Sequence, residues 1–580
     1  MLEVKKFPVH MADIPVDKSD MKKCLLTGLF EESADVNGVS RQFYTYLAPG
    51  LHYNQRCIVL APPSDMGDIS EYLEGSFWLQ FAEQQQIFLC ILKPQENKWD
   101  ISGEDADYMN KVYVKIQARD FYVTMQDNIY AVGIGDGATI AQQAVMKMTS
   151  EWSGLATVGN LDAAAMLNAE ATQKSEDAGK VELSLNASKC QIPVWMVWQD
   201  QKEVHGQIRD YWKKQNDVSD EKYSCGLADE IYFPCNVCKK STLNEEKVSQ
   251  VRITNHWDGR VSLELIEEIW QYIRQNCRHR SFGSKAIRKY KDPVEYGASL
   301  HKIQLGGYTR IWYEYVPEHV KEKGTKVPLV VTMHGRGGTA ETFFDISGMS
   351  LVAEERDFIT VFPEAGIYQQ KPDGLRNVLL WNGSYNGEPI DDVTFIRTLV
   401  EDVKSRYPID TERIYACGQS SGGMMTSTLA FSAPELFAAV SPWSAIRDPE
   451  HDIPVPEKIE PAVPYLFLLG EDDWLCVDKK NGQMEYQVTE SIAEFLRNLI
   501  KIYRLEEKPV TYQCGEISYY VYRNEKKTPM LVVGTVREMS HANYPRESWI
   551  AYDQFFSKFI KKQDGTLLYM GEDAIHTDKR

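Results

Sequence analysis

Residues 413–431 read RIYACGQSSGGMMTSTLAF. The apolar run IYAC ends in a turn rich in glycine and serine, and a longer run of small and apolar residues follows that turn. A short apolar run closed by glycine is typical of a buried strand, whereas the longer run is typical of a buried helix. The stretch therefore predicts a strand, a tight turn and a helix, which together form the repeating unit of a parallel sheet.

The same pattern occurs once more, earlier in the chain. Residues 128–146 read NIYAVGIGDGATIAQQAVM, with an isoleucine, a tyrosine and two glycines in the same relative places. Further blocks recur in the same order in both halves. These blocks pair 40–65 with 309–338, 192–201 with 463–473, and 255–273 with 540–560. Alternating strands and helices in both halves predict two tandem α/β domains, each a mostly parallel sheet flanked by helices.

The junction between the two domains is predicted from a change in composition. Residues 278–297, RHRSFGSKAIRKYKDPVEYG, are basic and interrupted by glycine and proline in an otherwise acidic chain of 580 residues. We expect the first domain at 1–285, the second at 286–565, and a polar, peripheral tail at 566–580.

The charge of the chain limits its partners. Eighty-three acidic against 64 basic residues give a net charge of −19, which repels nucleic acids and anionic membranes, so we expect neither as a partner. A homodimer is compatible with the sequence. The sequence shows no secretion signal and no apolar run long enough for a transmembrane helix, and several of its eleven cysteines lie inside apolar runs. These features favour reduced thiols and a cytoplasmic protein.

Three cysteines, Cys225, Cys235 and Cys238, lie close together in the sequence and raise the question of a metal site. Structural zinc is usually held by four ligands, and a single CxxC pair with one more distant cysteine and no paired histidines is more typical of a loop. We expect neither a metal nor another cofactor.

The turn in the opening stretch, Gly418–Gly422, has the pattern G-x-S-x-G directly after a predicted strand. In this motif a serine sits on a strained strand-to-helix turn, so that its hydroxyl stands above the sheet and the glycines avoid collisions with neighbouring backbone. The pattern identifies Ser420 as a nucleophile. The adjacent Ser421 has Gln419 where the motif needs glycine.

A serine nucleophile needs donors for the oxyanion that forms when it attacks a carbonyl. The stretch HGRGG, residues 334–338, follows a buried apolar run, and its glycines free the backbone to point N–H groups at that oxygen. We assign the donors to the backbone amides of Arg336 and Ser421. We expect His334 to shape this loop, because it comes too early in the chain to serve as the general base.

The nucleophile also needs a base and an acid, which should follow it in that architecture's chain order of serine, acid and histidine. His541 lies between the last predicted strand and the last predicted helix, where the base belongs. The block GEDDW offers the acid, for which we prefer Asp473 and keep Asp472 as the alternative. In this arrangement His541 accepts the proton of Ser420, and the acid orients the ring.

As a set, MHGRGGTAETF, DTERIYACGQSSGGMM, LFAAVSPWSA and GEDDW resemble the polyhydroxybutyrate depolymerase-like esterase family, which includes feruloyl and acetylxylan esterases. The resemblance covers roughly residues 295–560. It implies an α/β-hydrolase fold and hydrolysis of carboxylic esters through an acyl-enzyme, with Ser420, Asp473 and His541 as the triad. Many family members are secreted. Because this sequence lacks an export signal, small acyl or hydroxycinnamoyl esters, including carbohydrate-linked ones, are the expected substrates.

Trp381, Trp443 and Trp474 follow predicted strands or stand beside a catalytic block. We predict that they line an acyl or aromatic pocket, with core packing as the alternative. Two other functions remain open. The same triad cleaves amides, which would make the protein a serine peptidase, and a tandem pseudohydrolase would act as a binding module without catalysis.

The first half repeats the pattern of the second without its chemistry. Gly135 stands where Ser420 stands, and Pro62 and Pro63 replace the donor loop, although proline has no N–H to donate. Gln201, next to Asp200, lies opposite Asp473. His256 alone persists, and we expect it to be structural. The first half is therefore predicted to be a degenerate, non-catalytic hydrolase-like domain.

Overall fold

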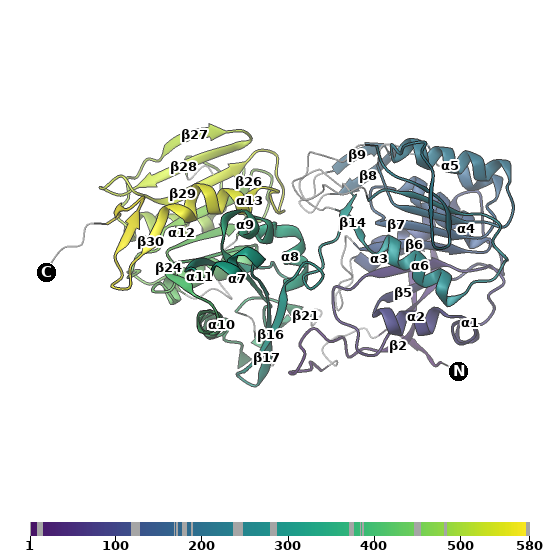
Figure 1. Cartoon of the computed structure of the whole chain (residues 1–580), viewed down its shortest axis with the longest axis horizontal. Coiled ribbons are helices and arrows are strands. Elements are labelled where there is room, and N and C mark those ends of the chain that lie inside the picture. Colours follow the sequence, from purple (N-terminus) through teal and green to yellow (C-terminus); the bar gives the residue numbers. More distant parts are fainter. Residues whose placement is uncertain are drawn as a thin grey trace.

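The computed structural model contains two large sheets, one of eleven strands and one of ten, side by side along the long axis of the molecule (Figure 1). We call the part around the eleven-stranded sheet the first unit and the part around the ten-stranded sheet the second unit. The structure describes residues 2–575 except 8–14, 118–127, 168, 170–171, 177–181, 187–189, 236–247, 279–286, 371–375, 383, 386–387, 446–453 and 481–483.

The first unit places its strands in the order β1-β2-β3-β5-β4-β6-β7-β10-β13-β12-β11. These strands are β1 (Val4–Lys6), β2 (Gly28–Val36), β3 (Val39–Leu47), β4 (Cys57–Ala61), β5 (Phe88–Leu92), β6 (Ile129–Ile134), β7 (Gly154–Val158), β10 (Val194–Val197), β11 (Tyr223–Cys225), β12 (Ala228–Tyr232) and β13 (Val251–Thr254). The helices are α1 (Ile69–Gly75), α2 (Trp78–Gln85), α3 (Glu104–Gln117), α4 (Gly137–Lys147), α5 (Glu203–Gln215) and α6 (Leu263–Ile273), and β8 (Thr172–Glu176) pairs with β9 (Glu182–Asn186).

The second unit has the order β16-β17-β19-β18-β24-β25-β26-β29-β28-β27. These strands are β16 (Ser299–Leu305), β17 (Tyr308–Tyr315), β18 (Val327–Met333), β19 (Ile359–Pro363), β24 (Ile409–Gln419), β25 (Ala439–Trp443), β26 (Tyr465–Gly470), β27 (Val510–Cys514), β28 (Ile517–Arg523) and β29 (Pro529–Val536). The helices are α7 (Glu318–Lys323), α8 (Ala340–Ser347), α9 (Met349–Arg356), α10 (Asp392–Arg406), α11 (Ser421–Ser432), α12 (Glu490–Ile502) and α13 (Glu547–Trp549), which continues through a π-helical turn (Ile550–Phe555).

Small sheets complete the chain. They are β14 (Asn276–Arg278) with β15 (Ile287–Lys289), β20 (Ile367–Gln370) with β21 (Arg376–Leu379), β22 (Ser384–Tyr385) with β23 (Glu388–Pro389), and β30 (Phe559–Lys561) with β31 (Leu567–Tyr569) and β32 (Glu572–Asp573).

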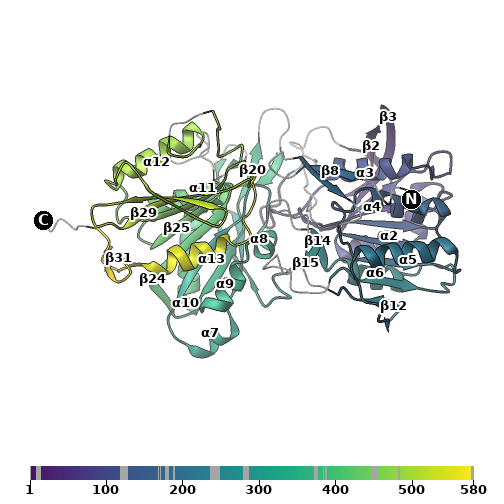
Figure 2. The same ribbon diagram turned by 90° about the horizontal axis from the view of Figure 1, so that it is seen from above.

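The two large sheets share one topology. Starting from β2 and from β16, ten strands follow in the same spatial and chain order, with parallel pairing in the centre and antiparallel pairing on both sides of it. In the first sheet, β1 adds a parallel edge strand beside β2. The central strands are buried along their whole length, because helices cover both faces of a parallel sheet. Figure 2 shows α12 on one face of the second sheet and α13 and α9 on the other. The predicted fold class, two tandem mostly parallel sheets flanked by helices, is confirmed.

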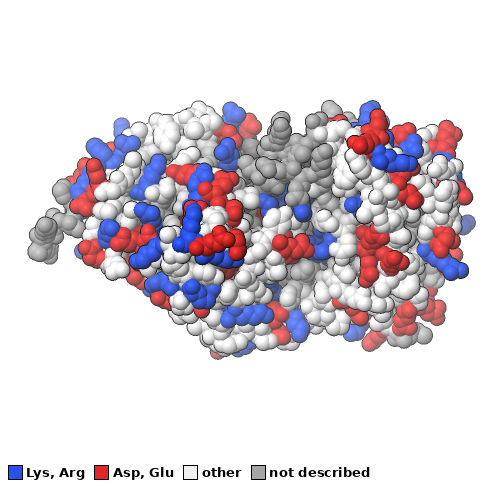
Figure 3. Space-filling view, viewed as in Figure 1, with Lys and Arg blue, Asp and Glu red and all other residues white. Residues whose placement is uncertain are grey.

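One face of the molecule shows how its charged side chains are distributed. On the face shown in Figure 3, acidic and basic side chains are interspersed over both units. Among the described residues, every helix is too short or too polar to cross a bilayer.

The N-terminal segment crosses from the first unit to the second. Met21 belongs to the hydrophobic core of the second unit, and the carbonyl of Lys18 accepts a hydrogen bond from Thr309 N at 2.9 Å. Residues of the predicted first domain, 1–285, therefore also contact the second unit. The sequence did not predict this contact, because a single methionine in a polar segment shows no hydrophobic periodicity.

The described parts of the predicted junction and tail form specific contacts. Arg288, in the expected linker, donates to both carboxylate oxygens of Asp345 in α8 at 2.5 and 2.6 Å. Residues 567–573 supply β31 and β32, and the buried Ala574 accepts hydrogen bonds from Asn524 and Thr528. The described part of the segment predicted as a polar, peripheral tail, 566–575, thus pairs its backbone in a small sheet, and residues 576–580 lie outside the described residues.

Candidate active site

Ser420 lies at the sharp turn between β24 and α11. Its backbone has φ of 54°, a strained value for a residue with a side chain, and its N–H donates to Trp443 O at 2.9 Å. A Cβ on Gly418 would lie 2.6 Å from Gly422 O, and one on Gly422 would collide with Met333 O. The glycines are therefore required, because strand and helix backbones approach too closely for any side chain.

His541 lies between Ser420 and Asp473. Its Nε2 is 2.9 Å from Ser420 Oγ, and its Nδ1 is 2.8 Å from Asp473 Oδ2. Asp473 follows β26 and is fully buried, while His541 follows β29 and keeps a partly exposed edge. A carboxylate at Nδ1 holds the proton on that nitrogen, which leaves the Nε2 lone pair facing the serine hydroxyl. The arrangement can remove the proton of Ser420.

The two candidate acids have different partners. Asp473 Oδ1 accepts from Leu475 N at 3.1 Å, so both of its oxygens have a donor. Asp472 forms an ion pair with Lys479 at the surface, and its N–H donates to Met539 O at 2.8 Å. The structure thus brings Asp473 to His541 and turns the carboxylate of Asp472 elsewhere.

The HGRGG loop packs against the nucleophile. A Cβ on Gly335 would lie 3.4 Å from Ser420 Cβ, so the two turns are in close contact. Gly338 N donates to Gly335 O at 3.1 Å and closes a turn in which Gly337 has φ of 68°, a conformation suited to glycine. Arg336 is the second residue of this turn and its side chain is exposed.

Ser421, the other predicted donor, is the first residue of α11. The first N–H groups of a helix have no partner inside the helix and carry the positive end of its dipole. This position suits the amide of Ser421 to an anionic oxygen next to Ser420.

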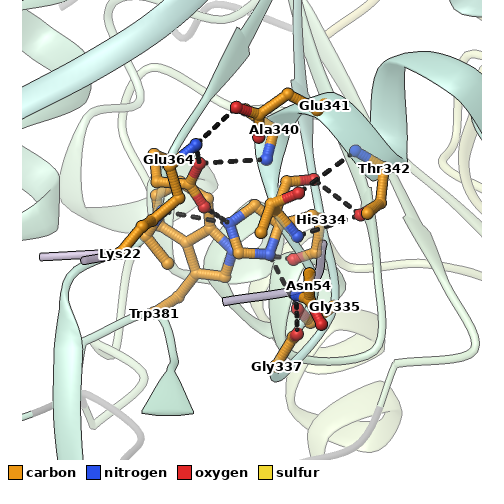
Figure 4. A network of polar contacts seen from close by, with 12 residues as sticks. Lys22, Asn54, His334, Gly335, Gly337, Ala340, Glu341, Thr342, Glu364 and Trp381 are labelled. Atoms are coloured by element: carbon orange, nitrogen blue, oxygen red, sulfur yellow. Dashed lines mark hydrogen bonds and ion pairs between the residues drawn. The ribbon is translucent and has the colours of Figure 1, made fainter. Parts of the chain in front are cut away.

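His334, the first residue of the HGRGG loop, is buried (Figure 4). Its Nδ1 is 2.7 Å from Gly335 O, its Nε2 is 3.0 Å from Ala365 N, and Glu364 Oε1 lies 3.3 Å from the same Nε2. Trp381 Nε1 donates to His334 O at 2.8 Å. These bonds agree with the loop-shaping role predicted for His334.

The three tryptophans differ in burial. Trp381 and Trp443 are 2% and 0% exposed, and Trp443 Nε1 donates to Ser441 Oγ at 2.8 Å. Core packing, the alternative considered for all three, describes these two. Trp474 is 51% exposed and directly follows Asp473, so of the three side chains it is the one that a ligand at the site could reach.

The first unit has a similar turn at Gly135, and the ring of Pro63 lies against it. Gly135 has φ of 62° and donates to Val158 O at 2.8 Å, as Ser420 does to Trp443 O. A Cβ at Gly135 would lie 3.3 Å from the ring of Pro63.

The first-unit counterparts of Asp473 and His541, Gln201 and His256, lie in loops. Gln201 contacts Asn255 at 3.4 Å, and the ring of Trp198 stacks on His205, a histidine other than His256. His256 itself sits at φ of 57° in the loop after β13.

Asp473, Cys476 and His541 place one potential metal-ligand atom each within 4.8 Å of one another. Asp473 and His541 are hydrogen-bonded to each other, and Cys476 Sγ donates to Ala445 O at 3.2 Å. Burial raises the pKa of the Cys476 thiol well above its usual value, which disfavours the thiolate that metals bind. Cys225 and Cys235 are exposed free thiols, and Cys238 lies outside the described residues.

Glu547 was not predicted from the sequence. It is buried at the start of α13 behind the histidine loop and accepts from Asn543 Nδ2 at 2.5 Å and from Tyr544 N at 3.0 Å. Burial raises its pKa to about 8. A glutamate at the start of a helix usually lies at the surface, where it interacts with the helix dipole. The residue type therefore gave no signal that Glu547 would be buried.

The geometry can be compared with that of known proteins. Residues 314–452 match the family model described as Esterase PHB depolymerase. The resemblance indicated by the sequence motifs is confirmed for this region. The esterase match includes the HGRGG loop and Ser420 but ends before Asp473 and His541, so these two assignments rest on chain order and geometry.

The curated relatives are esterases by name. Probable acetylxylan esterase A of Neosartorya fischeri is 32% identical over 137 residues, which are 23% of this chain and 35% of that protein. Feruloyl esterase B of Thermothelomyces thermophilus is 28% identical over 161 residues, 27% of this chain and 48% of that protein. The chain thus spans about a third to a half of the length of the relatives it matches.

Two of the solved structures that the chain matches also carry esterase names. Acetyl xylan esterase from Aspergillus awamori has a TM-score of 0.33 and 16% identity, covering 45% of this chain and 99% of that one. A structure titled ferulic acid esterase has a TM-score of 0.31 and 16% identity, covering 45% of this chain and 96% of that one.

Proposed function

We propose that the protein is a serine carboxylic ester hydrolase whose chemistry resides in the second unit. The observation that carries the proposal is the pair of hydrogen bonds joining Ser420 to His541 and His541 to Asp473, next to a glycine-rich loop. Ser420, Asp473 and His541 act as nucleophile, orienting acid and general base. The family match at residues 314–452 and the names of the relatives support the same reaction class.

The mechanism follows from the positions of these groups. Ser420 Oγ attacks the ester carbonyl while His541 Nε2 takes its proton, and the amides of Arg336 and Ser421 donate to the oxyanion. The tetrahedral intermediate then expels the alcohol, which receives the proton from His541. Water attacks the remaining acyl-Ser420 ester in the same way, with His541 as base, and releases the acid.

We propose small acyl or hydroxycinnamoyl esters as substrates, including esters attached to carbohydrate. The support is twofold: relatives are named acetylxylan esterase and feruloyl esterase, and the exposed ring of Trp474 stands beside Asp473, where an aromatic acyl group could stack. A cytoplasmic setting is proposed because the buried Cys24, Cys417 and Cys476 are free thiols, as in proteins of a reducing compartment.

The test is a substrate panel on the purified full chain: p-nitrophenyl acetate and butyrate, methyl ferulate, an acetylated xylan oligosaccharide and a peptide anilide. We expect ester hydrolysis, lowered by about a millionfold in Ser420→Ala. His256→Ala, which changes the counterpart of the catalytic histidine in the first unit, should leave the rate unchanged. More than a few per cent of wild-type activity in folded Ser420→Ala would refute the nucleophile, and cleavage of the anilide alone would favour a peptidase.

A further inference from the structure

The HGRGG loop is held by hydrogen bonds to its carbonyl oxygens, and one of these bonds comes from the first unit (Figure 4). Trp381 holds His334 O at 2.8 Å, and Gly338 N holds Gly335 O at 3.1 Å. Gly337 O, at the end of the turn, accepts from Asn54 Nδ2 at 2.6 Å. Asn54 belongs to the connection between β3 and β4 of the unit that lacks catalytic residues.

Backbone hydrogen bonds hold the loop that carries Asn54. It lies just before β4 with φ of 60°, a conformation that asparagine tolerates better than most residues. Its neighbour Tyr53 donates from its N–H to Lys22 O at 2.8 Å, and Cys24 N donates to Leu51 O at 2.7 Å. The Asn54 loop and the N-terminal crossing segment therefore form one hydrogen-bonded structure.

Lys22, on that crossing segment, provides a second link to the same region. Its Nζ is 2.5 Å from Glu341 Oε1 and 3.3 Å from Glu364 Oε2. Glu364 Oε2 also accepts from Ala340 N, the first residue of α8, which directly follows the loop. Lys22 is 4% exposed; burial alone would lower its pKa, but the carboxylates of Glu341 and Glu364 raise it above its usual value. Lys22 thus remains a cation that fixes the start of α8.

The polar links act beside one apolar contact, that of Met21 with the core of the second unit. A cavity of about 240 Å³ lies beside Asn54, between the first unit and the start of α8, and its lining includes Arg56, Thr339 and Thr342. A second cavity of about 120 Å³ adjoins Lys22. Open space flanks both contacts. The turn is also anchored inside its own unit, because Gly337 N donates to Leu379 O at 2.9 Å. The Asn54 bond adds a directed contact on the carbonyl side of Gly337, and such a bond acts only over a short range of distance and angle.

We propose that the first unit is a positioning element of the active site, in which Asn54 is the positioning residue for the oxyanion-binding amide of Arg336. The inference rests on the proposed ester hydrolysis. Arg336 lies between Gly335 and Gly337 in one turn, so a turn released at Gly337 O lets the Arg336 N–H swing away from the carbonyl that Ser420 attacks. Lys22 supports the same geometry from the other end, by fixing α8.

The effect is specific to the transition state. The oxyanion exists only after attack, so a misdirected Arg336 amide lowers kcat and leaves KM nearly unchanged. Removal of a whole oxyanion donor typically costs 100- to 1,000-fold. Asn54 acts through one neutral hydrogen bond, which bounds its own effect at roughly three- to tenfold in kcat.

The experiment compares Asn54→Ala and Asn54→Asp with the wild-type chain. Asn54→Asp keeps the size of the side chain but places an acceptor against Gly337 O, so we expect a larger fall in kcat than in Asn54→Ala. The matched control is Asn37→Ala, which replaces another asparagine at positive φ (53°) that is exposed in the β2–β3 turn of the same unit. Asn37→Ala should leave kcat unchanged.

Two measurements accompany kcat and KM on p-nitrophenyl acetate. A fluorophosphonate probe reports on Ser420: both variants at position 54 should label to the same final stoichiometry as wild type but more slowly by the same factor as kcat. Circular dichroism and thermal unfolding verify that the variants are folded. A folded Asn54→Ala and Asn54→Asp pair with kcat and labelling rate within twofold of wild type overturns the inference while ester hydrolysis stands. Wild-type protein that neither hydrolyses esters nor labels at Ser420 overturns both.

Discussion

Exchanging each candidate acid for its amide tests the orientation of His541. Asp473 receives two donors, His541 Nδ1–H on one oxygen and Leu475 N–H on the other. An asparagine has one oxygen and one NH₂, so it satisfies only one of these donors. If its NH₂ faces the ring, Nδ1 must become the acceptor, and the proton moves to Nε2, which then points a hydrogen at Ser420 Oγ instead of a lone pair.

The size of the effect follows from that tautomer. A histidine with its proton on Nε2 cannot accept the proton of Ser420, and loss of this orientation costs up to about 10⁴-fold in kcat, or roughly 5.5 kcal/mol. Asp472→Asn is the matched control: it removes only the exposed pair with Lys479, an interaction worth at most about 1 kcal/mol of stability, and should leave kcat unchanged.

The assay is kcat for p-nitrophenyl acetate between pH 6 and 9, with a folding check by circular dichroism. Asp473→Asn that keeps more than a tenth of the wild-type kcat would show that the acid does not set the tautomer. A collapse of activity in Asp472→Asn would transfer the role to that residue.

Two more predictions concern stability. Burial raises the pKa of Glu547 from 4.5 to about 8, so the folded state binds more protons than the unfolded state between these values; stability falls as pH rises through this window, by up to about 1.4 kcal/mol per unit. Urea unfolding at pH 5, 6.5 and 8 should show this decline in the wild type and a smaller one in Glu547→Gln; equal slopes would refute it. Gly422→Ala should prevent folding, because its Cβ would collide with the backbone oxygen of Met333, whereas Gly206→Ala, where nothing lies within 4 Å, should not; soluble expression and thermal unfolding measure both.

The sequence predicted the parts of the site that depend on chain order. Ser420 and His541 could be located because a strand-turn-helix motif and the last loop of an α/β sheet bring them to the same edge. The choice between Asp472 and Asp473 depends on which carboxylate the short turn after β26 points inward, and that orientation is not encoded in residue type. Whether a tryptophan is buried also depends on its packing in the folded chain. The sequence alone therefore did not distinguish the buried Trp381 and Trp443 from the exposed Trp474.

The contacts between the units lay beyond sequence reasoning for a different reason. Asn54, Lys22 and Met21 touch the second unit through single side chains drawn from loops and turns, and loops carry no hydrophobic period from which a partner could be inferred. The repeat predicted that two similar sheets exist. It said nothing of how one sheet's loops would meet the active edge of the other.

The ring of Pro63 beneath Gly135 leaves little room for a nucleophile at the position that corresponds to Ser420 in the first unit. Restoring a serine there would set its side chain against Pro63, and the same proline supplies no N–H for an oxyanion. A working centre would need the nucleophile, the donor loop, the acid and an oriented base to return together, and no single step on that route gains activity. Contact with its neighbour, as in the bond from Asn54 to Gly337 O, is therefore the role that we propose for this half.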